Sequence, residues 1–267
     1  MTRFLKWLLA PIRVTWLQPL YEKLYLFTLY AMNYGGGSYT EDSGEQFVLA
    51  YVARKTERQS KPIVIFDVGA NVGSYAQLVL KTFESRATVH CFEPSHSTYQ
   101  TLVAAVTAPT VIKHPFGLSS KTGQLPLYAD AEQSGMMSVY SRDLQHLNIS
   151  FGPMEVATFS TVDAFCREQN IPEISLLKID VEGHEFSVLE GAQQLLKDQR
   201  IRFIQFEFGG TNIDSRTFFR DFWKLLHDDF ILYRIVGNGL RRIDAYSELL
   251  EIFVAVNYFA ERKSNPV

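Results

Sequence analysis

The stretch of residues 63–73 constrains the fold more than any other part of the chain. It reads Ile63-Val-Ile-Phe-Asp-Val-Gly-Ala-Asn-Val-Gly73, an apolar run that passes an aspartate and enters a glycine turn. Glycines let the backbone approach a ligand closely, and a helix that follows such a turn offers its first, unpaired N–H groups. Turns of this kind bind ligands at the carboxyl ends of strands in open α/β sheets. We therefore expect a strand, a ligand-binding turn and a helix here.

The rest of the chain alternates between strand-like and helix-like patterns. The strands are expected at residues 63–66, 88–92, 110–113, 174–179, 201–208, 230–235 and 252–256, with helices including 184–196 and 215–226 and a short hairpin at 117–128. Alternation of this kind favours a parallel sheet that is covered by helices on both faces. The prediction is an α/β fold: a doubly wound, Rossmann-like sheet of seven strands.

Composition and charge limit the classes of molecule that the protein is expected to bind. Hydrophobic residues make up 46% of the chain and charged residues 21%, as in ordinary globular proteins. A net charge of −3 and a pI near 6.1 supply no basic field, which disfavours nucleic acid as a partner. The two cysteines, Cys91 and Cys166, do not form a disulfide framework. We expect both to be buried, reduced thiols in a cytoplasmic protein.

The first forty residues precede the α/β pattern. Their apolar run is interrupted at Arg13, before it reaches the roughly 20 residues that span a bilayer, and no small-residue cleavage site follows. We predict an N-terminal helical extension with a hinge (residues 1–40, with glycines at 35–37) and an α/β domain (residues 41–260). The extension is expected to pack on the domain or on a second copy in a homodimer, with peripheral attachment to a membrane as the alternative.

Two carboxylates indicate which of the cofactors that bind at such a glycine turn this chain would use. Glu93 ends the next strand, twenty residues after Gly73, where doubly wound nucleotide sites hold a ribose diol. The pattern G-x-G-x-x-G of nicotinamide sites is absent. Asp67 would repel a pyrophosphate but suits the amino group of S-adenosylmethionine. The residues therefore favour S-adenosylmethionine over NAD.

Three segments resemble the FkbM-type methyltransferases. They are Asp67-Val-Gly-Ala-Asn-Val-Gly73, Phe92-Glu-Pro94, and Leu177-Lys-Ile-Asp-Val-Glu-Gly-His-Glu185 followed by Leu189-Glu-Gly191. They stand in the order and at the spacing of that family, over about residues 44–256. The resemblance implies a class I methyltransferase sheet and S-adenosylmethionine-dependent O-methylation of a hydroxyl on a carbohydrate or other small metabolite. An NAD-dependent oxidoreductase and a non-catalytic cofactor-binding module are the alternatives.

The resemblance also assigns the cofactor-binding residues. It places Asp67, Gly69, Ala70, Asn71 and Gly73 around the methionine end, Glu93 on the ribose hydroxyls, Pro94 and Ser95 beside the adenine, and Gly117 and Leu118 beneath it. The acceptor, which is a small molecule, a saccharide or a lipid-linked sugar, is left open. We expect residues 129–153, a long polar stretch, to help shape its binding site.

The candidate catalytic residues follow the strand at 174–179. Methyl transfer requires alignment of the acceptor and removal of its proton. His184, with an ordinary pKa near 6.5, can accept that proton at neutral pH, although many family members have alanine there. Asp180 can do the same or orient the hydroxyl. Glu182 is either a third catalytic residue beside them or a cap of the helix that follows.

A carboxylate cluster is the last expectation. Glu207 ends the strand next to that of Asp180, and together with Glu182 the two can bind Mg²⁺, which would lower the pKa of an acceptor hydroxyl. The motif contains no cysteine ligands, which disfavours structural zinc. We assign no residue as a metal ligand and keep a divalent cation as the alternative mechanism.

Overall fold

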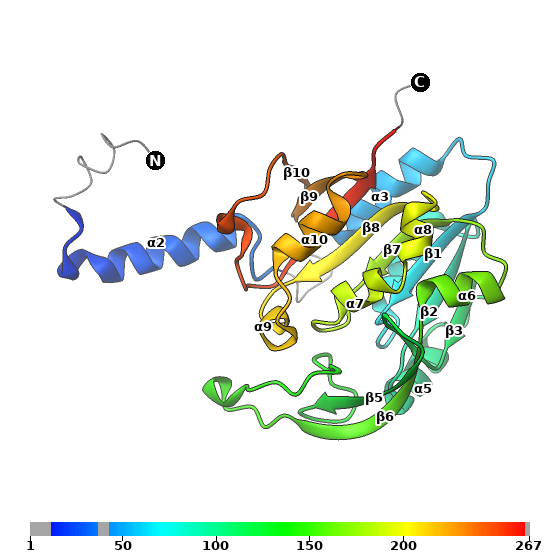
Figure 1. Cartoon of the computed structure of the whole chain (residues 1–267), viewed down its shortest axis with the longest axis horizontal. Helices are drawn as coiled ribbons and strands as arrows, with labels where there is room; N and C mark the ends of the chain where they lie inside the picture. The colour runs from blue at the N-terminus through cyan, green and yellow to red at the C-terminus, as the bar shows by residue number, and fades with distance from the viewer. Residues whose placement is uncertain (1–11, 37–42, 265–267) are drawn as a thin grey trace.

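The computed structural model describes residues 12–36 and 43–264, and an eight-stranded sheet forms its centre. The strands are β1 (Ile63–Val68), β2 (Ala87–Phe92), β3 (Val111–His114), β7 (Ile174–Ile179), β8 (Ile201–Phe208), β9 (Phe230–Val236), β10 (Gly239–Ile243) and β11 (Val256–Arg262). Their order across the sheet is β10-β9-β11-β8-β7-β1-β2-β3 (Figure 1). The strands β3, β2, β1, β7 and β8 are mutually parallel, as the alternating pattern predicted.

The far edge of the sheet differs from the prediction in two ways. The sheet has one strand more than the seven predicted, because β9 and β10 form a hairpin around Asn238. The two residues between the strands are Gly237 and Asn238, a pair that favours such a hairpin turn. The last strand also begins where the expected run 252–256 ends, since β11 spans Val256–Arg262 and runs antiparallel between β8 and β9.

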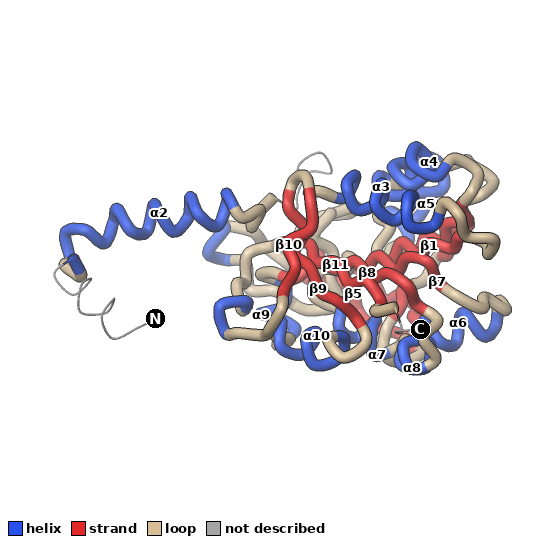
Figure 2. The backbone as a smooth tube through the Cα atoms, turned by 90° about the horizontal axis from the view of Figure 1, so that it is seen from above, coloured by secondary structure: helices blue, strands red, loops and turns tan. Residues whose placement is uncertain are grey.

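Helices cover both faces of the sheet, which confirms the doubly wound arrangement. On one face lie α3 (Glu45–Thr56), α4 (Ser74–Phe83) and α5 (His96–Ala105), and on the other lie α6 (Val162–Glu168), α7 (Glu185–Glu190), α8 (Gln193–Lys197) and α10 (Phe219–Leu226) (Figure 2). Successive strand residues serve opposite layers, so that Ile65 packs in one core and Phe66 in the other. Cys91 and Cys166 are both buried and unpaired.

Two expected helices are each divided. The segment 184–196 forms α7 and α8, which are separated at Gly191 because its backbone approaches Ser119 closely. A Cβ atom on Gly191 would lie 2.0 Å from the carbonyl oxygen of Ser119. The segment 215–226 forms α10 only from Phe219, while α9 (Thr211–Ser215) precedes it.

A second, three-stranded sheet adjoins the main one. Its strands are β4 (Gly117–Leu118), β5 (Gly123–Ala129) and β6 (Gly152–Ser160), in the order β4-β6-β5. The prediction of a hairpin within residues 117–128 was wrong, because β4 and β5 do not pair with each other and β6 lies between them. Between β5 and β6 the chain forms the expected long loop, which is tied back by a bridge between Tyr128 and Ser138.

The described part of the N-terminal extension is a helix that projects from the body. It comprises a short turn (Thr15–Leu17) and α2 (Gln18–Ala31), and both views show α2 standing away from the sheet (Figures 1 and 2). Within residues 12–36 only Leu29 and Tyr34 are buried. In the described segments, no helix has both the length and the apolar character needed to cross a membrane.

Gly69→Ala should destabilise the fold strongly. Gly69 has a φ of +80°, and a Cβ atom there would lie 1.8 Å from the carbonyl oxygen of Asp180. Since backbone cannot yield as a flexible side chain can, we expect a loss of about 3 kcal/mol or more in urea denaturation followed by circular dichroism. Gly123→Ala, whose Cβ meets nothing within 4 Å, is the control and should change stability by less than about 0.5 kcal/mol. Equal stability of the two variants would contradict this account of the turn.

Candidate active site

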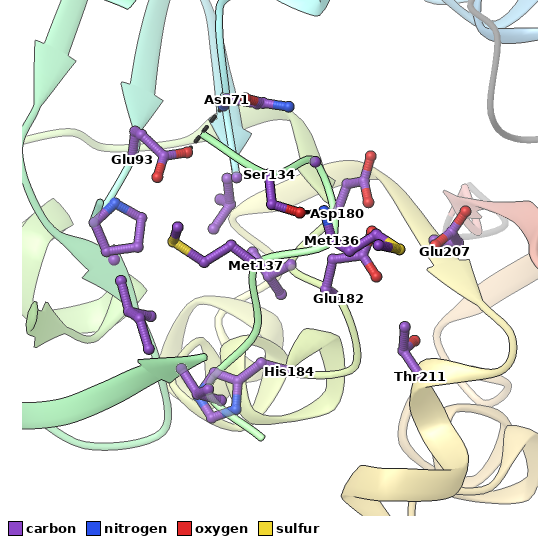
Figure 3. Close-up of a pocket in the computed structure, with 18 of the residues that line it drawn as sticks. Asn71, Glu93, Ser134, Met136, Met137, Asp180, Glu182, His184, Glu207 and Thr211 are labelled. Carbon is purple, nitrogen blue, oxygen red and sulfur yellow. Dashed lines mark hydrogen bonds between the residues drawn. The ribbon is translucent and has the colours of Figure 1, made fainter. Parts of the chain in front are cut away.

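A cavity of about 590 Å³ lies at the carboxyl ends of β1, β2, β7 and β8. Of the predicted site residues, Gly69, Asn71, Glu93, Pro94, Gly117, Leu118, Asp180, Glu182 and His184 line it. Asp67, Ala70, Gly73 and Ser95 are not among the lining residues. In Figure 3, Glu93 lies at one side of the cavity, while Asp180, Glu182 and Glu207 gather at the other. The two ends differ in chemistry.

Glu93 forms the first end. Its two carboxylate oxygens accept hydrogen bonds from the backbone N–H groups of Asn71, at 3.0 Å, and Ser95, at 2.9 Å. These bonds fix the carboxylate across the start of the glycine turn. Burial raises the pKa of Glu93 to about 7, although both backbone N–H groups oppose that shift. The group is thus near the balance between its charged and neutral forms at neutral pH.

Two buried polar atoms of residues that line the cavity have no partner among the described residues. They are Oδ1 of Asn71 and Oγ1 of Thr98, and both are buried in side chains that line the cavity. A buried polar atom without a hydrogen bond costs free energy, which a ligand in the cavity can recover. Sequence reasoning missed Thr98, because a threonine inside α5 carries no motif.

The glycine turn owes its shape to left-handed backbone at three positions. Gly69, Asn71 and Gly73 have φ values of 80°, 48° and 91°. Gly73 serves packing rather than the cavity, since a Cβ atom there would lie 2.5 Å from the side chain of Val106. Asn71 is one of the few residue types other than glycine that tolerate this conformation.

A buried lysine joins the turn to the neighbouring strand. The parallel register places Asp67 of β1 opposite Lys178 of β7. Nζ of Lys178 lies 3.3 Å from Oδ1 of Asp67 and 3.4 Å from Oδ2 of Asp180, over the ring of Tyr75. Burial alone would lower the pKa of Lys178, but the carboxylates of Asp67, Asp180 and Glu45 outweigh it and raise that pKa, so the ammonium stays charged.

The turn after β7 is held by Glu185. Its Oε1 accepts hydrogen bonds from the backbone N–H groups of Val181, at 3.0 Å, and Gly183, at 3.1 Å. Gly183 has a φ of +100°, and a Cβ atom there would lie 2.8 Å from the carbonyl oxygen of Thr211. Glu185, at the first position of α7, makes the bonds that were considered for Glu182. Glu182 faces the cavity instead.

Three carboxylates meet at the second end of the cavity. Asp180, Glu182 and Glu207 each offer an oxygen within 4.8 Å of the others. Nη1 of Arg142 lies 3.2 Å from Oε2 of Glu182, and Lys178 supplies the positive charge next to Asp180. Burial, followed by the charge of Asp180, raises the pKa of Glu182 to about 8 and that of Glu207 well above its ordinary value. Proximity of Glu207 to Asp180 is as predicted.

His184 is buried at the wall of the cavity and precedes α7 rather than lying in its first turn. Its Nδ1 lies 3.0 Å from the hydroxyl of Tyr140, and its Nε2 lies 2.9 Å from the hydroxyl of Ser119. Burial lowers the pKa of His184 to about 4, so the ring is neutral at pH 7. A neutral imidazole with two hydroxyl partners donates from one nitrogen and accepts at the other.

Two loops complete the cavity. Together with Thr211 of α9, they contribute lining residues that the motifs did not assign: Ser134, Gly135, Met136, Met137, Val139 and Arg142 from the long loop, and Phe253, Val254 and Ala255 before β11. A Cβ atom on Gly135 would lie 3.8 Å from the amide nitrogen of Asn71, so the loop reaches the glycine turn. The long loop was expected to shape a binding site, but its individual residues follow no pattern.

Comparison with known proteins identifies similar chains. A model of the methyltransferase FkbM domain matches residues 67–233. The hexuronic acid methyltransferase AglP of Haloferax volcanii is 30% identical over 168 residues, which cover 62% of this chain and 64% of AglP. Methyltransferase 1 of Beauveria bassiana is 26% identical over 143 residues, 48% of this chain and 57% of that protein. The chain therefore spans about six tenths of the length of these curated relatives.

A solved structure is also similar. The SAM-dependent O-methyltransferase of Thermotoga maritima aligns with 83% of this chain and 66% of its own, at 13% identity and a TM-score of 0.42.

Lys178→Met should destabilise the protein by about 3–5 kcal/mol, because it leaves the fully buried Asp67 without its counter-charge. Adding Asp67→Asn should restore part of the loss, which a double-mutant cycle by thermal denaturation measures. Lys61→Met is the control: it removes the exposed pair with Glu173 and should cost less than about 1 kcal/mol. Additive effects of the Lys178 and Asp67 substitutions would refute the coupling.

Proposed function

Because the chain belongs to the FkbM methyltransferase family, we propose that it is an S-adenosylmethionine-dependent O-methyltransferase that acts on a hydroxyl of a carbohydrate or other small metabolite. The observation that carries the proposal is the cavity with two unlike ends. One end presents Glu93 beside polar atoms without partners, and the other presents carboxylates with two protein cations. Similarity to a hexuronic acid methyltransferase supports a saccharide as the acceptor.

The residues at the Glu93 end fit the nucleoside of the cofactor. An ionised Glu93 accepts two hydrogen bonds, as the neighbouring hydroxyls of a ribose require. Oδ1 of Asn71 and Oγ1 of Thr98 gain partners when a polar ligand fills this end. The long loop, with Met137, adds an apolar wall that suits an aromatic base. Gly69 keeps the backbone free of a side chain where the turn approaches β7.

The residues at the carboxylate end fit the acceptor. The bound cofactor supplies a methyl group on a sulfonium, and the acceptor oxygen must lose its proton as it takes that group. Asp180 is the residue we assign to hold the acceptor hydroxyl and receive the proton. Its side chain is 38% exposed to the cavity side of the sheet, and Lys178 stabilises its charge. Glu182 and Glu207 are placed to accept hydrogen bonds from further hydroxyls.

His184 and a divalent cation are the alternatives for proton removal. The His184 ring is neutral and lines the cavity, but both nitrogens are engaged by hydroxyls and the pKa near 4 makes it a weak acceptor. A cation such as Mg²⁺ would need the oxygens of Asp180, Glu182 and Glu207 together. Lys178 and Arg142 already pair with two of these carboxylates, which reduces the need for a metal.

We also propose that residues 1–40 are an extension distinct from the transferase domain at 41–260. The exposed apolar side chains of α2 make it suitable for association, either with a second copy of the chain or with the surface of a membrane. Its described end is held to the domain, since the backbone N–H of Gly35 donates to the carbonyl oxygen of Ala255 at 2.7 Å.

The cofactor assignment predicts that S-adenosylhomocysteine binds in isothermal titration calorimetry and that NAD does not. Glu93→Ala should weaken binding by about 1.5–3 kcal/mol, the scale of hydrogen bonds to a charged group. Because burial raises the pKa of Glu93 to about 7, affinity should fall as pH drops below 7, when the carboxylate becomes protonated.

Two controls accompany this titration. Glu155→Ala removes a nearby carboxylate that accepts from the backbone N–H of His96 and does not line the cavity; because its charge helps to raise the pKa of Glu93, affinity should not fall. Glu93→Gln cannot ionise and should remove the loss of affinity below pH 7. Binding of NAD in place of S-adenosylhomocysteine would instead support an oxidoreductase, and binding without turnover of any acceptor would support a non-catalytic module.

The proton acceptor is tested by paired substitutions under saturating substrates. Asp180→Asn should lower kcat by at least about a hundredfold, since a general base contributes about 10²–10⁴-fold. His184→Ala should cost less than about tenfold, because its two hydroxyl partners can rearrange or bind water. The reverse order of effects would assign proton removal to the imidazole. Chelator-treated enzyme should keep its rate, and a loss that Mg²⁺ restores would make the three carboxylates metal ligands.

A further inference from the structure

The helix α2 exposes more apolar surface than a helix in water retains without a partner. Tyr25, Phe27 and Tyr30 of α2 and Trp16 of the short turn before it are 57–77% exposed, and Leu20, Leu24 and Leu26 of α2 are 49–63% exposed. In the described part of the chain, Leu29 is the one buried residue of this helix. Exposed apolar patches of this size mark interaction sites. The question is what covers them.

The base of the helix is rigidly attached, so α2 cannot fold back on its own body without breaking that attachment. Tyr34 is 2% exposed, and its hydroxyl accepts a hydrogen bond at 3.1 Å from Nη1 of Arg234, whose guanidinium lies over the Tyr34 ring. Nδ2 of Asn33 donates to the carbonyl oxygen of Ile235. The helix therefore presents its surface outward, as Figure 1 shows.

The pattern of side chains fits a membrane poorly. At 14 residues and 1.5 Å per residue, α2 is about 21 Å long, short of the roughly 30 Å hydrocarbon core. A helix that lies in the membrane surface needs one strongly polar face. Its charged residues, Glu22 and Lys23, are consecutive and so point about 100° apart, and apolar side chains lie on every side. A helix that is apolar all round is typically buried in protein.

A second copy of the same helix fits both the spacing and the charges. Trp16, Pro19, Lys23, Leu26 and Tyr30 recur at intervals of three and four, the spacing of a helix-pairing stripe. An antiparallel pair whose two-fold axis passes between residues 22 and 23 sets Glu22 of each copy against Lys23 of the other. The same axis sets Pro19 against Leu26.

We propose that the chain forms a two-fold dimer through antiparallel pairing of α2, with Glu22 and Lys23 exchanging ion pairs across the axis. The anchored bases then place the two sheets at opposite ends of the helix pair, so the dimer is elongated. The proposal specifies the association suggested above for residues 1–40, and its test reads mass rather than turnover, so it stands or fails apart from methyl transfer.

The test is light scattering coupled to size exclusion on the full-length chain, with small-angle X-ray scattering for shape. The wild type should have twice the chain mass and an elongated profile. Leu26→Glu should yield the monomer mass with an unchanged circular dichroism spectrum, since α2 lies outside the core. Val156→Glu, at an equally exposed apolar residue of β6, should leave the dimer intact.

A charge-reversal cycle tests the register. Glu22→Lys and Lys23→Glu should each raise the dimer dissociation constant about tenfold, because each reversal brings like charges together at two symmetric points. The double variant should return to the wild-type value. A monomeric wild type would overturn the proposal, and a monomer that cosediments with phosphatidylcholine and phosphatidylglycerol vesicles would replace it with membrane attachment. A dimer that both reversals leave unchanged would refute the α2 pair.

Discussion

The site depends on the buried ammonium of Lys178, which pairs with the carboxylates of Asp67 and Asp180. It lies inside a parallel sheet, where a charged group is costly unless opposite charges surround it. Asp67 on the adjacent strand and Asp180 at the end of its own strand provide them. The same contact joins β1, which precedes the glycine turn, to β7, which precedes the turn held by Glu185. Lys178 therefore connects the strands that carry the two ends of the cavity.

The rest of the cavity is built outward from these two turns. The backbone of the first turn donates to Glu93, and Glu185 accepts from the backbone of the second. Loops with little regular structure then cover the rigid base, and they contribute Arg142 and the apolar residues of the wall. In such a division the loops can vary while the two turns stay fixed.

Sequence patterns predicted the parts that depend on local chemistry. The glycine turn, the position of Glu93 after the next strand and the alternation of parallel strands with helices follow from residues close together in the chain, and the structure has them as expected. The pairing of β4 and β5 with β6 could not be read in this way, because it joins residues between 23 and 42 positions apart. The partners of His184 likewise come from Ser119 and Tyr140, on separate segments with no motif. Its burial, which decides its pKa, is a property of the assembled loops.

The position of β11 bears on how the chain reaches this fold during synthesis. This strand is made after β9 and β10, yet it lies between β8 and β9 and pairs with both. Until residues 256–262 have emerged, the β9–β10 hairpin has no neighbour that joins it to β8, and the apolar edge of β8 stays open. The nascent chain must therefore keep the edge of β8 unpaired until β11 has been made, and an unpaired strand edge of this kind favours aggregation.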